Sequence, residues 1–143
     1  MAGNRHANDW SEVAVAMDRG LRLFADFAKP LLIAHAADNL SVSNLLFLVS
    51  IGDGEARVND LVKRGRYVGS NASYALKALQ EGGYIERRQD PGDRRNAVVC
   101  WTEKGAHLVR TVKQACNDAK GKSSSVIEAL RAFEDHCSRL PEA

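Results

Sequence analysis

The chain lacks the features that mark secreted, membrane-spanning or zinc-binding proteins. Its three cysteines, Cys100, Cys116 and Cys137, are odd in number and have no paired Cys or Cys/His spacing. No apolar run approaches the roughly 20 residues of a transmembrane helix, and charged and polar residues follow Arg5 where a signal peptide would be apolar. We therefore expect a cytoplasmic protein with reduced, structural thiols and no metal site. Oxidant sensing by Cys116 or Cys137 is the alternative.

The motifs of common catalytic sites are also missing. The sequence contains no Gly-rich phosphate loop, no Gly-x-Ser-x-Gly elbow and no His-Glu-x-x-His helix. Its acidic residues are scattered instead of paired in an apolar setting, which gives general acid/base catalysis no site. We therefore predict that the protein is not an enzyme and needs no cofactor.

Charge is unevenly distributed, although the formal net charge is only +2. The segment from Arg57 to Arg110 contains eleven Lys/Arg and six Asp/Glu, whereas the rest of the chain contains nine and twelve. A protein that docks one face on a polyanion requires such a basic segment. A chance fluctuation of surface charge is the alternative.

The stretch from Val58 to Gly105 predicts a helix, a turn, a second helix and a hairpin. The second helix is expected to begin near Gly69, with Ser70 as its N-cap, and to bury Ala72, Leu76 and Leu79 on one face. The other face then presents donors, acceptors, one aromatic ring and one cation, which are the groups that contact bases and phosphates. These residues are Asn71, Ser73, Tyr74 and Lys77, and the turn before them adds Lys63, Arg64 and Arg66.

A hairpin is predicted to follow the second helix. Gly82-Gly83 suits a left-handed helix end, the residues after it form a strand, and Pro91-Gly92 is expected to form a type II turn. Arg94 and Arg95 then lie at the tip. They are either an ordinary solvated turn or a basic wing that enters a minor groove, and the neighbouring polar helix favours the wing.

Near both ends of the chain, apolar residues recur at alternating steps of three and four, as on one face of a helix; we call these two stripes the terminal seams. Pro30 is expected to bend or split the first helix. Two amphipathic terminal helices offer more apolar surface than a small middle domain can cover, so we predict a homodimer. Packing of the same seams on the chain's own core is the alternative. The dimerisation residues would be Trp10, Met17, Leu21, Val126, Leu130 and Phe133.

The segments 82–87, 90–95 and 101–105 resemble the winged-helix core of MarR-type bacterial transcription regulators, with Trp101 in the place of a leucine. Within that family, segment 66–74 is most similar to regulators that control an L,D-transpeptidase gene. The resemblance implies a mainly α fold with a small β-wing. A winged helix-turn-helix core at 40–106 would lie between dimerisation helices at 1–39 and 107–143.

The resemblance also implies partners and residue roles. The partners are double-stranded DNA, a second copy of the chain and a small-molecule effector, with no membrane. Asp93 and Arg95 would brace the wing and Arg94 would enter the DNA. The other DNA contacts would come from Arg66, Ser70, Asn71, Ser73, Tyr74 and Lys77, and the effector pocket from Phe24, Leu31, His35 and Phe47. For His35 itself, its place on the apolar seam favours a buried, hydrogen-bonded histidine, and an effector or metal contact is the alternative.

These expectations converge on one function. The chain is predicted to be a repressor that binds an inverted-repeat operator as a homodimer and responds to a small molecule. A winged-helix protein-interaction module without DNA binding is the alternative, and apolar residues would then be expected on the second helix and wing tip.

Overall fold

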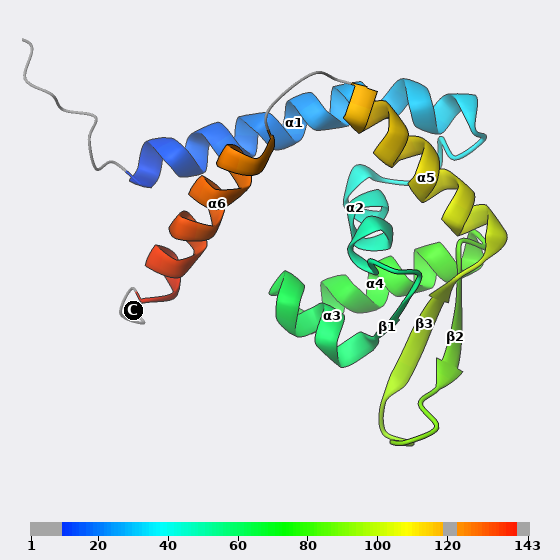
Figure 1. Ribbon diagram of the computed structural model, residues 1–143. Helices are drawn as coiled ribbons and strands as arrows, with labels where there is room; N and C mark the ends of the chain where they lie inside the picture. The colour runs from blue at the N-terminus through cyan, green and yellow to red at the C-terminus, as the bar shows by residue number, and fades with distance from the viewer. Residues whose placement is uncertain (1–9, 119–122, 140–143) are drawn as a thin grey trace, which may run out of the picture. The chain divides into compact units, whose positions relative to one another are not determined.

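The computed structural model describes residues 10–118 and 123–139 and is mainly helical, with one small sheet (Figure 1). The predicted fold class, a mainly α protein with a β-wing, is confirmed. In the described ranges, none of the helices combines the length and apolar character needed to cross a membrane. The elements in chain order are α1 (Trp10–Ala34), α2 (Val42–Ser50), β1 (Glu55–Arg57), α3 (Val58–Gly65), α4 (Gly69–Glu81), β2 (Ile85–Gln89), β3 (Ala97–Trp101), α5 (Glu103–Asp118) and α6 (Ser123–Ser138).

The chain forms two compact units. One contains α1 as far as Phe24 together with α6, and the other runs from Ala25 to Cys116. Helix α1 continues through Pro30 without a break, so the predicted split does not occur. A proline removes only one backbone donor, and the neighbouring turns remain helical.

The core of the larger unit is built by α2, α4, α5 and the sheet. Helix α2 starts where Ser41 Oγ accepts a hydrogen bond from the Asn44 amide at 3.1 Å. Its Leu45, Phe47 and Leu48 are fully buried. Trp101, at the position where the resemblance noted above would place a leucine, donates its indole N–H to the Leu48 carbonyl at 2.9 Å. The tryptophan thus adds a donor, which a leucine would lack, to a carbonyl near the end of α2 that also accepts from the Ile51 amide at 3.4 Å.

The turn between α3 and α4 is held by Tyr67. Its ring lies 5.0 Å from the ring of Phe47, and its amide donates to the Val62 carbonyl at 3.1 Å. A Cβ on Gly65 would lie 2.1 Å from the Tyr67 ring, so any larger residue there would displace the ring from this position. Arg66 then adopts a left-handed conformation with φ 51°, which turns the chain toward α4.

The sheet has the order β1-β3-β2, and all its pairs are antiparallel. Gly83, with φ 73°, takes the left-handed position predicted for the end of α4 and leads the chain into β2. Strands β2 and β3 form a hairpin of five residues per strand, and Figure 1 shows its tip extending beyond the helices of the same unit. The sheet therefore carries the wing tip away from the core.

Candidate nucleic-acid interface

Helix α4 is buried on one face and polar on the other, as predicted. Ala72, Leu76 and Leu79 are at most 5% exposed, while the ring of Tyr74 is among the most exposed apolar groups in the described residues, at 74%. The exposed polar face consists of Ser70, Asn71, Ser73, Tyr74 and Lys77. Lys77 Nζ lies 3.9 Å from a Glu81 oxygen, a loose surface pair that leaves its charge available to a stronger partner.

The prediction that Ser70 caps α4 is wrong. Helix α4 begins at Gly69, and the extended N-cap position is taken by Val68, two residues before Ser70, with φ −68° and ψ 138°. Ser70 is therefore already inside the first turn. In the described structure no side chain accepts a hydrogen bond at this N-terminus, so its amides remain available to an external anion.

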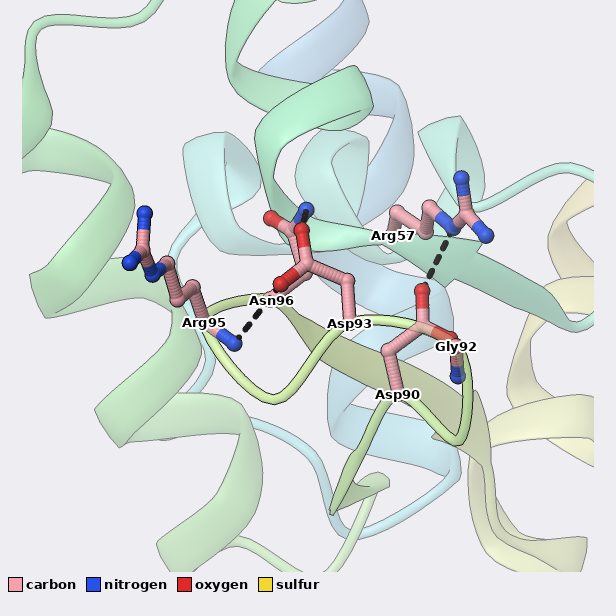
Figure 2. A network of polar contacts seen from close by, with 6 residues as sticks. All are labelled: Arg57, Asp90, Gly92, Asp93, Arg95 and Asn96. Carbon is pink, nitrogen blue, oxygen red and sulfur yellow. Dashed lines mark hydrogen bonds and ion pairs between the residues drawn. The ribbon is translucent and has the colours of Figure 1, made fainter.

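A buried carboxylate supports the base of the wing (Figure 2). Asp90 follows β2 and is only 5% exposed. Its Oδ1 accepts a hydrogen bond from the Gly92 amide at 2.9 Å, and its Oδ2 lies 2.7 Å from Nε of Arg57 in β1. The second contact is an ion pair and not a well-aligned hydrogen bond. Sequence patterns did not reveal this pair, because Arg57 and Asp90 are distant in the chain and meet only through the sheet.

Aspartates, and not a type II turn, close the wing tip. Gly92 does not have the positive φ that a type II turn requires, so the predicted Pro91-Gly92 turn is wrong. Asp93 Oδ1 accepts from the Arg95 amide at 3.0 Å, and Asp93 Oδ2 accepts from the Asn96 side-chain amide at 2.9 Å. The Arg95 bond uses the backbone, and Figure 2 shows its guanidinium directed away from the network.

The wing carries an open groove of about 320 Å³. It is lined by Arg87, Arg88, Gln89, Arg94, Arg95, Asn96 and Ala97. Gln89 steadies the tip by donating to the Arg94 carbonyl at 3.3 Å, and Arg88 forms an ion pair with Glu55 of β1. The groove therefore gathers guanidinium groups on a hairpin that is fixed from several sides.

A second hollow, of about 420 Å³, connects the wing to the helix. It is lined by Ser73, Leu76, Lys77, Gln80, Glu81 and Arg87. Arg87 lines both hollows, so the polar face of α4 and the basic wing form one surface, here called the α4–wing surface. Sequence reasoning did not include Arg87 or Arg88, although the alternation of side chains along the Arg-rich strand could have drawn attention to them.

The other cations of the helix-turn-helix differ in how they are held. Arg64 Nη2 donates to the Ser50 carbonyl at 3.3 Å and so ties α3 to α2. Lys63 and Arg66 are exposed, and both side chains can reach an external anion.

The linings of the three hollows described in the larger unit contain none of the predicted effector residues. Phe47 is fully buried and packs on Tyr67. His35 lies just beyond α1, where it is exposed, and its ring is 5.6 Å from that of His107. The expectation of a buried His35 is therefore wrong. Leu31 is half-buried in this unit and Phe24 is half-buried in the smaller one.

The cysteines are free, as expected. Cys100 Sγ donates to a Glu55 carboxylate oxygen at 3.5 Å. Burial and this hydrogen bond raise the pKa of the thiol. Because the thiolate is the reactive form, Cys100 is poorly suited to oxidant sensing.

The smaller unit leaves apolar surface exposed. The Trp10 ring packs against Phe133 at 5.6 Å and stacks on His136 at 4.6 Å, so α1 and α6 contact each other within one chain. Packing within the chain therefore accounts for part of both seams. Leu21 is nevertheless 51% exposed and Val126 58% exposed. Met17 is exposed as well, and Leu130 is half-buried.

Together, the two-helix motif, the antiparallel hairpin and the polar α4–wing surface define a winged helix-turn-helix protein. Comparison with known proteins gives the family. Residues 38–96 match the model of the MarR family. The winged helix-turn-helix of this chain belongs to the MarR family, as the sequence resemblance indicated.

The chain is also similar to a transcriptional activator. The chain is 37% identical over 110 residues to the exopolysaccharide II synthesis transcriptional activator ExpG of Rhizobium meliloti (strain 1021). That match covers 77% of this chain and 55% of the relative, so the chain spans about half of the relative's length.

Solved structures share the fold at low sequence identity. A MarR transcriptional regulator from Methanosarcina mazei Go1 has a TM-score of 0.72 at 17% identity, covering 91% of this chain and 99% of that one. Streptococcus pneumoniae FabT in complex with DNA has a TM-score of 0.66 at 17% identity, covering 93% and 100%.

Proposed function

We propose that the protein regulates transcription by binding double-stranded DNA through the α4–wing surface. The observation that carries this proposal is the continuity of the surface: an exposed polar helix face joins a braced, arginine-lined wing through a shared hollow. An α-helix fits the major groove, and arginine on a hairpin fits the narrow minor groove beside it. A protein-interaction module would be expected to expose several apolar groups here, whereas this surface exposes one aromatic ring, that of Tyr74, among polar and basic groups.

Each part of the surface receives a role. Asn71, Ser73 and Tyr74 are proposed to contact base edges, and their exposure near the start of α4 supports this role. The uncapped amides of α4 favour a phosphate, which Ser70, Lys77 and Arg66 can also reach. Arg94 enters the minor groove from a tip that Asp93 holds.

The protein is proposed to act as a homodimer. The half-exposed Met17, Leu21 and Val126 support this assembly, since a second copy would remove their side chains from water. The two copies of α4, which are the proposed reading helices, would lie about 34 Å apart in a symmetric dimer. They would then select an inverted repeat with half-sites about ten base pairs apart.

Regulation is proposed to depend on the distance between the two winged helix-turn-helix regions of the dimer. A small molecule that favours a mismatched spacing would release the DNA, and by linkage DNA would weaken the binding of that molecule equally. The sequence predicted repression, whereas the Rhizobium meliloti relative is named an activator. The same docking can produce either sign, because the sign depends on where the operator lies relative to the promoter.

Two substitutions test the DNA-binding proposal, with a duplex selected from a random library as the specific site. Asn71→Ala removes a base-edge partner and should cost about 1–3 kcal/mol on the selected duplex and little on random DNA. Arg94→Ala should weaken binding to the selected duplex and to random DNA alike. It should also reduce the salt slope, which is the slope of the logarithm of the binding constant against the logarithm of salt concentration, by about one unit for each winged helix-turn-helix of the dimer, here called a reading head. Titrations at several salt concentrations measure both effects. If the unmodified protein selects no duplex, or Asn71→Ala weakens both DNAs equally, α4 does not read bases.

A further inference from the structure

The arginines near the wing differ in whether a carboxylate of this protein already holds them. Arg57 is paired with Asp90, and Arg88 with Glu55. These two ion pairs use much of the anion-binding capacity of their guanidinium groups. Within the described parts of the chain, Arg87 has no ion-pair partner and is exposed. Its charge is therefore available to an external anion.

Strand register explains why Arg87 differs from its neighbour. Arg88 pairs across the sheet with Val98, on the face that carries Arg57 and Glu55. Arg87 pairs with Val99, which is fully buried, and therefore projects from the opposite face. The alternation of the strand thus separates Arg87 from the carboxylate that holds Arg88.

Arg87 also occupies the junction between the two halves of the α4–wing surface. It shares the 420 Å³ hollow with Ser73 and Lys77 of α4. It also shares the 320 Å³ groove with Arg94 and Arg95 of the wing. No other residue lines both of these hollows.

The position determines what Arg87 meets on DNA. If α4 lies in a major groove and the wing tip enters the adjacent minor groove, the sugar-phosphate backbone runs between them. We propose that Arg87 binds a phosphate of this backbone and so fixes the position of the reading helix relative to the wing. The fork of N–H donors on a guanidinium matches phosphate oxygens in a bidentate arrangement. This inference rests on the proposed DNA-binding function.

Arg87→Gln tests the inference, with Arg88→Gln as the matched control. Loss of a phosphate contact should reduce the salt slope by about one unit per reading head and weaken selected and random DNA to a similar extent. Arg88→Gln should change the slope much less, because Glu55 already neutralises that charge. Arg87→Lys keeps a cation and should retain most of the slope while losing bidentate geometry. Circular dichroism melts of all three variants verify folding.

A second measurement locates the contact. Neutral methylphosphonates are placed one at a time along the selected duplex, and the unmodified protein should lose affinity at its contacted phosphates. Arg87→Gln should become insensitive at one of these positions in each half-site and keep the others. An unchanged salt slope and an unchanged phosphate pattern in Arg87→Gln would overturn the inference while leaving the proposed function in place. Failure of the unmodified protein to bind DNA would overturn both.

Discussion

Replacement of Gly105 by alanine tests how closely α5 lies against the sheet. A Cβ on Gly105 would lie 2.0 Å from the Tyr84 carbonyl oxygen and 3.0 Å from the carbonyl carbon. The Tyr84 backbone is held in place, because its carbonyl accepts from the Thr102 amide at 3.1 Å and its own amide donates to the Leu79 carbonyl at 2.9 Å. The alanine would therefore force α5 away from the start of β2.

The clash should outweigh the better helix propensity of alanine. Glycine in a helix interior costs about 1 kcal/mol relative to alanine, which is an upper limit for Gly105 in the first turn of α5 and favours the substitution. Overpacking a buried site costs about 1–3 kcal/mol or more, and a collision with backbone belongs at the upper end. We therefore expect Gly105→Ala to lower the free energy of unfolding by about 2 kcal/mol.

The same substitution in α1 provides the control. A Cβ on Gly20 meets no atom within 4 Å, so Gly20→Ala should stabilise the protein by about 0.5–1 kcal/mol. Urea unfolding followed by circular dichroism, at one fixed protein concentration, measures both variants. Opposite shifts of the two midpoints would support the packing argument. A Gly105→Ala midpoint equal to or above that of the unmodified protein would refute the close approach of α5.

Two further predictions concern the wing and the dimer. Asp90→Asn removes the anion beside Arg57, so the base of the wing should lose about 1 kcal/mol of local stability. The backbone amides there should then exchange hydrogen about fivefold faster. Unchanged exchange would show that the ion pair does not brace the wing. Leu21→Asp or Phe133→Asp places a charge in the terminal seams and should weaken dimer and DNA affinity together. Sedimentation and DNA titration measure the two affinities, and a loss of stability alone would assign the residue to the core of one chain.

Local sequence signals predicted the features that depend on a few consecutive residues. The spacing of Ala72, Leu76 and Leu79 identified the buried face of α4, because helical periodicity converts sequence directly into orientation. Gly83 marked the end of the same helix for a similar reason, since few other residues adopt its positive φ without cost.

Features that depend on competition between neighbouring groups were predicted less well. Ser70 and Val68 are both close enough to the start of α4 to set its first turn, and the structure places the N-cap at Val68. At the wing tip, Pro91-Gly92 favours one turn, but the carboxylates of Asp90 and Asp93 hold another by accepting backbone amides. Such a choice depends on hydrogen bonds that residue preferences do not reveal.

The charge of the α4–wing surface shows why composition alone describes an interface poorly. Eleven basic residues lie between Arg57 and Arg110, yet several already have partners within the protein. Arg57 and Arg88 are held by carboxylates, Arg64 by a carbonyl of α2, and Lys104 donates to the Gly82 carbonyl at 2.8 Å. Counterion release on DNA binding depends on the phosphates that are neutralised, so cations paired with carboxylates contribute little to it, and cations tied to carbonyls contribute only where they still reach a phosphate. For each reading head, the salt slope of the unmodified protein should therefore follow the number of cations on the α4–wing surface that no carboxylate holds. It should be well below the eleven basic residues of the segment from Arg57 to Arg110.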